Sequence, residues 1–273
     1  MYNDKSSILP VKLRGMGLKS DEMEKIRISA VKYANTYPFI WGLRESGFDK
    51  KVIVETDHPS ECAEKLITGR ADIGLIPVAA LPKVKNYNII GKYCIGADGD
   101  VRTVMLFSNS PFEDVDTICL DYRSRSSVNL TKVLASHMWK RNFKWVDTSD
   151  SFDFINIGKN QAVVLIGDQC FVSEKKFVHA MDLAAEWKRF TGRPFVFAVW
   201  AANRPLEEQF ISEFNEALAL GVNNLGKVAS YFSEVSVIGD DELEKYLRYN
   251  IDFNFDSKKK EAMELFLDLL GKI

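Results

Sequence analysis

Short apolar segments alternate with amphipathic ones in the first part of the chain. Residues 26–31, 51–56 and 72–77 are apolar runs of strand length, and apolar residues recur at helical spacing between them. Pro38 and Pro59 stand where helices begin, since the first helical turn does not use the N–H that proline lacks. This order predicts a β-α-β-α-β unit, whose ligand lies beyond the carboxyl ends of the strands.

A second series of strands and helices follows a glycine-rich turn that we predict at Gly96 and Gly99. A helix is predicted from about Ser126, because apolar residues then recur along one stripe. The strands predicted in this part are residues 101–108, 117–121, 162–167 and 195–202. Alternation of this kind is typical of an α/β fold, and we expect mixed, mainly parallel sheets.

The chain turns helical after Pro205. Residues 210–222 place their apolar side chains on one face, and so does the last helix near the C-terminus. Such a face favours docking on the protein's own core over a site for a partner. We therefore expect C-terminal helices that close the fold.

The chain divides into two lobes in our prediction. It contains no linker rich in glycine, serine or proline, so two crossover strands, residues 101–108 and 195–203, are the expected hinge. One lobe would then contain residues 23–104 and 203–273, and the other residues 105–202. Residues 1–22 precede Met23 and the first clear strand, and we expect them to be a disordered extension.

The composition excludes several classes of protein. A hydrophobic fraction of 46% with 12% aromatic residues excludes a disordered chain. The 36 Lys and Arg residues nearly balance 38 Asp and Glu residues, so no broad field attracts nucleic acid or an anionic membrane. We therefore expect neither partner, and any anion must be bound locally.

The termini and cysteines indicate a cytoplasmic protein. No continuous apolar segment resembling an export signal begins the chain, and no run of 18 apolar residues occurs. Four cysteines stand far apart without metal-ligand spacing, so we predict buried thiols. They are Cys62, Cys94, Cys119 and Cys170.

Six segments, in this order, resemble the chorismate dehydratase family of the futalosine route to menaquinone. They are IRISAVKYANTYPF, ADIGLIPVAALP, YCIGADGDVRTVMLFS, LDYRSRSSVNL, VVLIGD and GRPFVFAVWAANRPL. The resemblance is strong over residues 24–206 and general in the C-terminal helices. It implies a fold like the type 2 periplasmic binding proteins, with two α/β lobes and a ligand between them.

The same resemblance implies a reaction. Chorismate loses its ring hydroxyl as water and gives 3-[(1-carboxyvinyl)oxy]benzoate, without a metal or organic cofactor. Chorismate is then the small-molecule partner, and the oligomeric state stays open. The resemblance implies functional roles for Asn35 in its Tyr-x-Asn-Thr motif and for Thr103, where many relatives have serine.

Asn35 follows the first strand, where its amide can donate and accept hydrogen bonds, although a cap is the ordinary role of asparagine there. Its neighbour Thr36 is either a further substrate-binding residue or the cap of the following helix. Thr103 keeps the hydroxyl of the family serine with a stiffer rotamer, which leaves hydrogen bonding open and puts a nucleophilic role in doubt. Asp100 also departs from the family, which usually has proline.

Ser124, Arg125, Ser126 and Ser127 are the predicted carboxylate-binding segment. A helix that starts there presents free N–H groups and a positive dipole end, and the hydroxyls add donors. The alternative is ordinary capping by one serine, with Arg125 in solvent. Nearby Arg123 is a second candidate partner for a carboxylate.

Gly167 and Asp168 end the strand at residues 162–167 and are also predicted in the substrate site. Asp168 would orient Arg125 or cap the next helix, and capping is favoured because a carboxylate beside a dianionic ligand is costly.

The residues identify no general base. His58, His137 and His179 each fit a structural or solvated role. We therefore put forward the hypothesis that the substrate's own enolpyruvyl carboxylate removes the ring proton, while Asn35 and Thr103 hold the leaving hydroxyl.

Three other functions compete with the dehydratase. A solute-binding protein shares the fold but normally carries an export signal or lipid anchor. The related enzyme 1,4-dihydroxy-6-naphthoate synthase lacks the Tyr-Ala-Asn-Thr turn. A regulatory ligand-sensing domain would need an attached DNA-binding segment, and nothing here resembles a helix-turn-helix motif.

Overall fold

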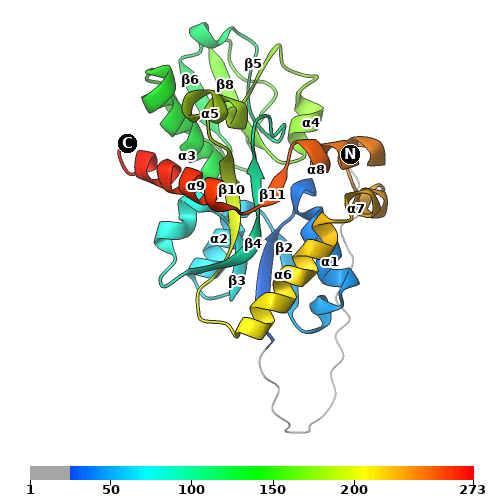
Figure 1. The fold of residues 1–273 in the computed structure, drawn as a ribbon. Coiled ribbons are helices and arrows are strands. Elements are labelled where there is room, and N and C mark those ends of the chain that lie inside the picture. Colours follow the sequence, from blue (N-terminus) through cyan, green and yellow to red (C-terminus); the bar gives the residue numbers. More distant parts are fainter. Residues whose placement is uncertain (1–24) are drawn as a thin grey trace.

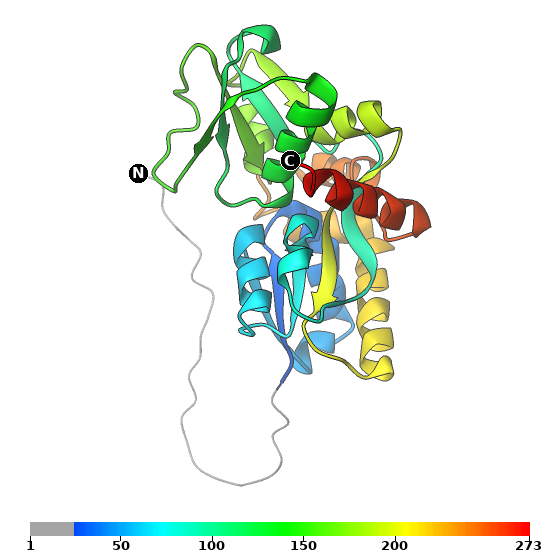
Figure 2. The same ribbon diagram turned by 90° about the vertical axis from the view of Figure 1, so that its left-hand side faces the viewer.

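The protein consists of two α/β lobes, each built on one mixed sheet (Figure 1). The computed structural model describes residues 25–273. The predicted extension, residues 1–22, lies outside the described residues, as do residues 23 and 24. Figure 2 shows the lobes one above the other, with the C-terminal helix α9 (Ser257–Leu270) beside the level where they meet.

The first lobe has a six-stranded sheet in the order β11-β4-β10-β3-β1-β2. Its strands are β1 (Arg27–Val31), β2 (Ile53–Asp57), β3 (Ile73–Pro77), β4 (Asn88–Ala97), β10 (Phe195–Ala202) and β11 (Asp252–Asn254). Strand β1 pairs in parallel with β2 and β3, whereas β10 runs antiparallel to β3 and β4. The predicted strands at residues 26–31, 51–56, 72–77 and 195–202 are confirmed to within two residues.

The second lobe has a five-stranded sheet in the order β7-β6-β8-β5-β9. Its strands are β5 (Val104–Ser108), β6 (Thr117–Leu120), β7 (Lys144–Asp147), β8 (Gln161–Ile166) and β9 (His179–Asp182). Parallel pairs join β6 to β7 and β8, and antiparallel pairs join β5 to β8 and β9. Both sheets are mixed, as predicted. Antiparallel pairs are more frequent in them than the predicted, mainly parallel arrangement implies.

Helices cover the sheets of both lobes. The first lobe carries α1 (Tyr37–Glu45), α2 (Pro59–Ile67), α6 (Glu208–Val222), α7 (Leu225–Phe232) and α8 (Asp240–Tyr249), and the second carries α3 (Ser126–Val133), α4 (Gln169–Ser173) and α5 (Leu183–Thr191). Helices α1 and α6 lie on the face of the first sheet opposite α2 (Figure 2). No helix in residues 25–273 is long and apolar enough to cross a membrane.

Helices α1 and α6 cross at two glycines. A Cβ atom at Gly42 would stand 2.1 Å from the carbonyl oxygen of Ala217, and one at Gly221 would stand 1.6 Å from that of Pro38. Only residues without a side chain allow the two backbones to approach this closely.

The alternation of side chains along a strand builds two cores in the second lobe. Val104 and Leu106 of β5 join the large core that continues from the first lobe, whereas Met105 and Phe107 face a smaller cluster on the other side of the sheet. The four cysteines are free and buried, as predicted.

Two predictions about the strands were wrong. Gly96 does not form a turn, because it lies within β4 and pairs with Val196 and Asp252. The strand β4 itself was not predicted. The grouping of residues 195–202 with the second lobe also differs from the structure, because β10 pairs with β3 and β4 of the first sheet along its length. The chain therefore passes between the lobes at residues 98–103 and 192–194.

Candidate active site between the lobes

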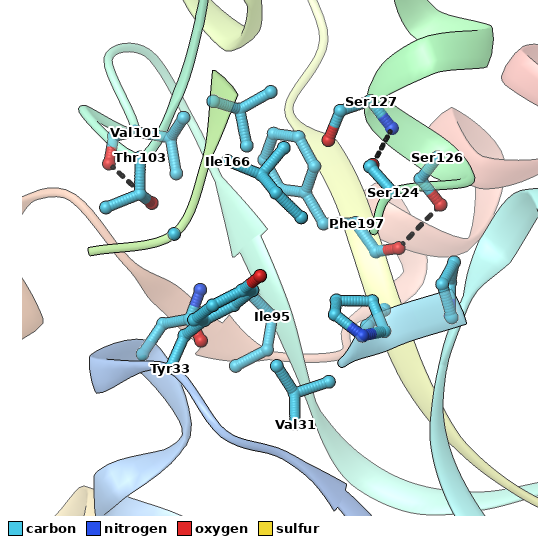
Figure 3. Close-up of a pocket in the computed structure, with 16 residues that line it drawn as sticks. Val31, Tyr33, Ile95, Val101, Thr103, Ser124, Ser126, Ser127, Ile166 and Phe197 are labelled. Atoms are coloured by element: carbon cyan, nitrogen blue, oxygen red, sulfur yellow. Dashed lines mark hydrogen bonds between the residues drawn. The ribbon is translucent and has the colours of Figure 1, made fainter. Parts of the chain in front are cut away.

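A pocket lies between the lobes, at the carboxyl ends of strands from both sheets (Figure 3). Val31 and Pro77 end β1 and β3 in the first lobe, and Ile166 ends β8 in the second. The space measures about 480 Å³ including its mouth. The β-α-β order of the sequence predicts a ligand at this edge of the first sheet, and Asn35 and Pro77 both line the pocket.

Tyr33 projects into the pocket from the turn after β1 (Figure 3). Its hydroxyl lies 3.0 Å from Nδ1 of His58, the residue before α2. Burial lowers the pKa of His58, and the charges of Lys32 and Arg123 lower it further. His58 is therefore neutral at pH 7 and can accept the hydrogen bond of Tyr33, whose own pKa burial raises.

Asn35 lies in η1 (Ala34–Thr36), a short 3₁₀ helix that joins β1 to α1, and its side chain lines the pocket. Thr36 does not line it. This residue is fully buried, and its hydroxyl donates to Oδ1 of Asn35 at 3.3 Å. The predicted capping bond from Thr36 to α1 is absent from the structure. Thr36 thus supports the side chain of Asn35 without lining the pocket itself.

Thr103 lines the pocket from the crossover between the lobes and is only 1% exposed. The preceding residue, Arg102, has a φ of 61°. The carboxylate of Asp182 accepts the N–H groups of Val101 and Arg102 at 2.9 and 2.7 Å and also caps α5. Burial raises the pKa of Asp182 to about 6, although hydrogen bonds from backbone N–H groups, among them that of Arg102, lower it. One carboxylate therefore fixes the crossover that presents Thr103.

All three predicted serines line the pocket at the start of α3 (Figure 3). Ser124 lies just before the N-cap residue Arg125, and its hydroxyl accepts the N–H of Ser127 in the first turn at 3.1 Å. The hydroxyl of Ser126 donates to the carbonyl of Phe197 in β10 and accepts the N–H of Ala79 at 3.3 Å. Ser126 therefore links the second lobe to the first, which leaves less of its hydroxyl for a ligand.

The two arginines near these serines lie outside the pocket. Arg125 is exposed, in agreement with the alternative of a solvated side chain. Arg123 donates to both carboxylate oxygens of the fully buried Asp121 at 2.7 Å each. Asp121 therefore neutralises the charge of Arg123, which stacks over the rings of Tyr122 and Phe154.

Gly167 lines the pocket, and Asp168 beside it reaches the opposite lobe. The carboxylate of Asp168 accepts the backbone N–H of Ala34 at 3.0 Å. It makes no capping bond to α4, although we favoured that role from the sequence. Burial raises the pKa of Asp168 to about 6, although the bond from Ala34 lowers it.

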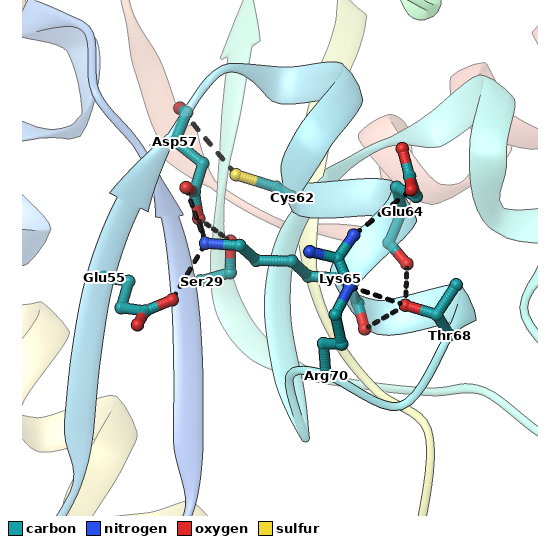
Figure 4. Close-up of polar contacts among 8 residues, drawn as sticks. All are labelled: Ser29, Glu55, Asp57, Cys62, Glu64, Lys65, Thr68 and Arg70. Atoms are coloured by element: carbon teal, nitrogen blue, oxygen red, sulfur yellow. Dashed lines mark hydrogen bonds and ion pairs between the residues drawn. The ribbon is translucent and has the colours of Figure 1, made fainter.

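A partly buried ion pair joins the last turn of α2 to the end of β2 (Figure 4). Nζ of Lys65 lies 2.6 and 2.7 Å from the two carboxylate oxygens of Asp57 at the end of β2. Ser29 of β1 donates to the same carboxylate at 2.7 Å. These contacts tie α2 to β1 and β2, so they set where His58 meets Tyr33.

Three residues of this region were not predicted as part of the site from the sequence. Tyr33 stands in the same turn as Asn35, and its place after a strand was a usable signal. His58 received only a structural role. Tyr246 of α8 lies 2.8 Å from the Thr103 hydroxyl, and nothing in its helical pattern indicated that contact.

The pocket's other chemistry is limited. His137 and His179 do not line it. No group of three or more His, Cys, Asp or Glu side chains in residues 25–273 could hold a metal ion. Burial raises the pKa of Cys62 to about 12 and that of Cys170 well above its usual value, so both thiols stay protonated. The side chains that remain can bind, orient and donate hydrogen bonds.

Comparisons with known sequences give one family and one enzyme. A sequence model of the family described as menaquinone biosynthesis matches residues 26–272. Chorismate dehydratase of Thermus thermophilus is 25% identical over 267 residues, which cover 88% of this chain and 93% of that protein.

Comparisons with solved structures give the fold. Protein AF1704 from Archaeoglobus fulgidus superposes with a TM-score of 0.71 at 15% identity, covering 92% of this chain and 98% of the other. The alkanesulfonate-binding protein SsuA of Xanthomonas axonopodis pv. citri, bound to MOPS, has a TM-score of 0.66 at 12% identity and covers 91% of this chain and 92% of its own. The two-lobed fold like that of the periplasmic binding proteins is thereby confirmed.

Proposed function

The chain belongs to the menaquinone biosynthesis family, and on that premise we propose that it is a hydro-lyase that dehydrates chorismate to 3-[(1-carboxyvinyl)oxy]benzoate. The observation that carries the proposal is the pairing of Asn35 and Thr103 in one pocket between the lobes. The Thermus relative supports the choice of substrate within the family.

The pocket suits an elimination that does not depend on a general acid or base from the protein. Amide and hydroxyl groups from Asn35 and Thr103 can hold a leaving hydroxyl, and the start of α3 offers its positive dipole end to a carboxylate. Apolar walls, among them Val31, Ile95 and Phe197, exclude water from the ring. We assign binding of one carboxylate to Ser124, Ser127 and the first N–H groups of α3.

The reaction balances without an oxidant or reductant. The ring C–H bond beside the ether breaks, its electron pair forms the new ring double bond, and the C–O bond of the hydroxyl breaks. Hydroxide leaves and combines with the proton as water. Aromatisation drives the reaction, and orientation of the substrate can contribute up to about 7 to 11 kcal/mol to lowering the barrier.

We retain the enolpyruvyl carboxylate of the substrate as the base. The protein offers one other candidate near the pocket, the Tyr33–His58 pair, in which the phenol and Nδ1 of His58 share a hydrogen bond. We propose that His58 orients the side chain of Tyr33 and is not the base, because His58 itself does not line the pocket.

Closure of the lobes would complete the site. Contacts such as that of Asp168 with Ala34 join the lobes. We propose that the lobes separate to admit chorismate and then close over it.

Incubation of the purified protein with chorismate tests the function directly. We expect loss of chorismate and appearance of a product lighter by one water, identified by mass spectrometry and by its aromatic absorbance. A binding protein would return chorismate unchanged, with heat of binding in a calorimeter. That result would overturn the proposed enzyme.

A further inference from the structure

Tyr246 is a fully buried tyrosine beneath the pocket. It lies on α8, in the C-terminal part of the chain, and its ring meets the edge of Phe171 from α4 at a centroid distance of 5.0 Å. Helix α8 thus reaches the second lobe, and the phenol stands where residues of both lobes meet.

The hydroxyl of Tyr246 contacts the proposed site through Thr103. Oγ1 of Thr103 lies 2.8 Å away. Burial raises the pKa of Tyr246 well above its usual value, although the hydrogen bond with Thr103 lowers it. The phenol therefore keeps its proton and serves as a neutral hydrogen-bonding group.

Thr103 has little else to hold its hydroxyl. Its remaining contact within the described residues is the carbonyl of Val101 at 3.4 Å, which is a weak bond. Asn35 receives the hydroxyl of Thr36 at 3.3 Å, which is also long. Of the two contacts of the Thr103 hydroxyl, the one with Tyr246 is the shorter, so it contributes more to the orientation of that hydroxyl.

Tyr246 joins segments that are distant in the sequence. Thr103 belongs to the crossover between the lobes, whereas Tyr246 comes from α8. Asp182 holds the backbone of the crossover before Thr103, and Tyr246 contacts the Thr103 hydroxyl itself.

We propose that Tyr246 is a positioning residue that orients the hydroxyl of Thr103 so that Thr103 and Asn35 can together hold the leaving hydroxyl. The inference rests on the proposed function, since it assigns Tyr246 a part in the same reaction. Tyr246 does not line the pocket and acts through Thr103.

Steady-state kinetics of Tyr246→Phe with chorismate test the proposal. The variant keeps the ring that packs on Phe171 and loses only the hydroxyl. We expect kcat to fall about 10- to 100-fold with KM changed by less than about threefold, because misplacement of reacting groups slows chemistry more than binding. Tyr249→Phe is the matched control, since Tyr249 lies on the same helix and is 77% exposed.

A double variant shows whether Tyr246 acts through Thr103. In the Thr103→Ala background, Tyr246→Phe should cost at least threefold less than in the unaltered protein. Full activity of Tyr246→Phe, or equal losses in both backgrounds, would overturn the positioning role.

Crystal structures separate this inference from the proposed function. If the unaltered protein leaves chorismate unchanged, the dehydratase assignment fails, and structures of the unaltered protein and Tyr246→Phe decide the positioning role alone. A displaced side chain of Thr103 in the variant supports it. An unchanged position of that side chain refutes it.

Discussion

The carboxylate of Asp168, at the end of β8, accepts the backbone N–H of Ala34, in the turn after β1, at 3.0 Å. The two residues belong to different lobes and are 134 positions apart. Their bond therefore exists only when the lobes are together, and it places a buried carboxylate at the joint.

This buried carboxylate predicts a pH-dependent stability. The folded protein holds a proton on Asp168 up to its raised pKa of about 6, whereas the unfolded chain releases it near 3.8. Stability from this group is therefore present below pH 4 and lost as pH rises through 6. Asp168→Asn should be more stable than the unaltered protein at pH 7.5, and the difference should vanish near pH 4.

Thermal unfolding of both proteins from pH 4 to pH 8 measures this difference. Asp182 has a raised pKa as well, so only the comparison between the two proteins isolates Asp168. Asp49→Asn, at an exposed position, should show no such trend. A pH-independent gap for Asp168→Asn would contradict the linkage.

Gly167→Ala should disrupt the joint between the lobes. Gly167 has a φ of 72°, and a Cβ atom there would stand 2.6 Å from the ring of Tyr33. Gly69 has nearly the same φ, 73°, with nothing within 4 Å of an added Cβ atom. Gly69→Ala should therefore lower the free energy of unfolding by about 1 to 2 kcal/mol from backbone strain alone.

The Gly167→Ala variant should lose more stability than Gly69→Ala and should raise KM for chorismate, because Tyr33 must move. Chemical denaturation and kinetics measure the two effects. Equal losses at both positions, with unchanged KM, would show that the contact of Gly167 with Tyr33 is unimportant.

Lys65→Met should destabilise the first lobe. The change leaves the carboxylate of Asp57, which is 10% exposed, without its cation, and loss of a hydrogen bond between charged groups costs about 1.5 to 3 kcal/mol. Lys51→Met is the control, because Lys51 pairs with Glu213 at the surface and such pairs contribute about 0 to 1 kcal/mol. Urea denaturation distinguishes the two, and similar losses would mean that the pair in Figure 4 is not effectively buried.

Asn35→Ala and Thr103→Ala, made separately, should each lower kcat with chorismate at least about 100-fold, the usual loss when one preorganised donor is removed. Thr103→Ser keeps the hydroxyl and should stay within about tenfold of the unaltered protein. Asn109→Ala, at an exposed loop position, should have no effect. Undiminished product formation by both alanine variants would remove these residues from the mechanism.

His58→Gln separates the two candidate bases. If the substrate's carboxylate removes the proton, the variant should lose less than about tenfold in kcat/KM and keep the shape of the pH–rate profile. A protein base at His58 would make the activity of the unaltered enzyme fall below the pKa of His58, and this acid limb would disappear in the variant.

The pattern of apolar residues was sufficient for most elements. Strands β3 and β10 are continuous apolar runs whose residues are all buried, and β1 is buried over Ile28–Val31. Their length and flanking residues are local properties, so they can be predicted without knowing what the strands pack against.

Strand β4 could not be predicted in this way, because its glycines resemble a turn. A Cβ atom at Gly91 would stand 2.8 Å from the side chain of Trp200, and one at Gly96 would stand 3.0 Å from the carbonyl of Phe195. These glycines are required by close neighbours in the sheet. The reason for these glycines lies in tertiary contacts, and the sequence alone suggests a turn where the structure has a strand.

The sequence by itself determined the α/β pattern and, through its motifs, which polar residues follow the strands: Asn35, Thr103 and the serines before α3. Only the tertiary structure decided the hydrogen bonds around these residues. These bonds join His58 to Tyr33, Asp168 to Ala34, and Tyr246 to Thr103. Each of these contacts joins segments distant in the chain, and its geometry depends on how whole elements dock. No local pattern of residues encodes that docking.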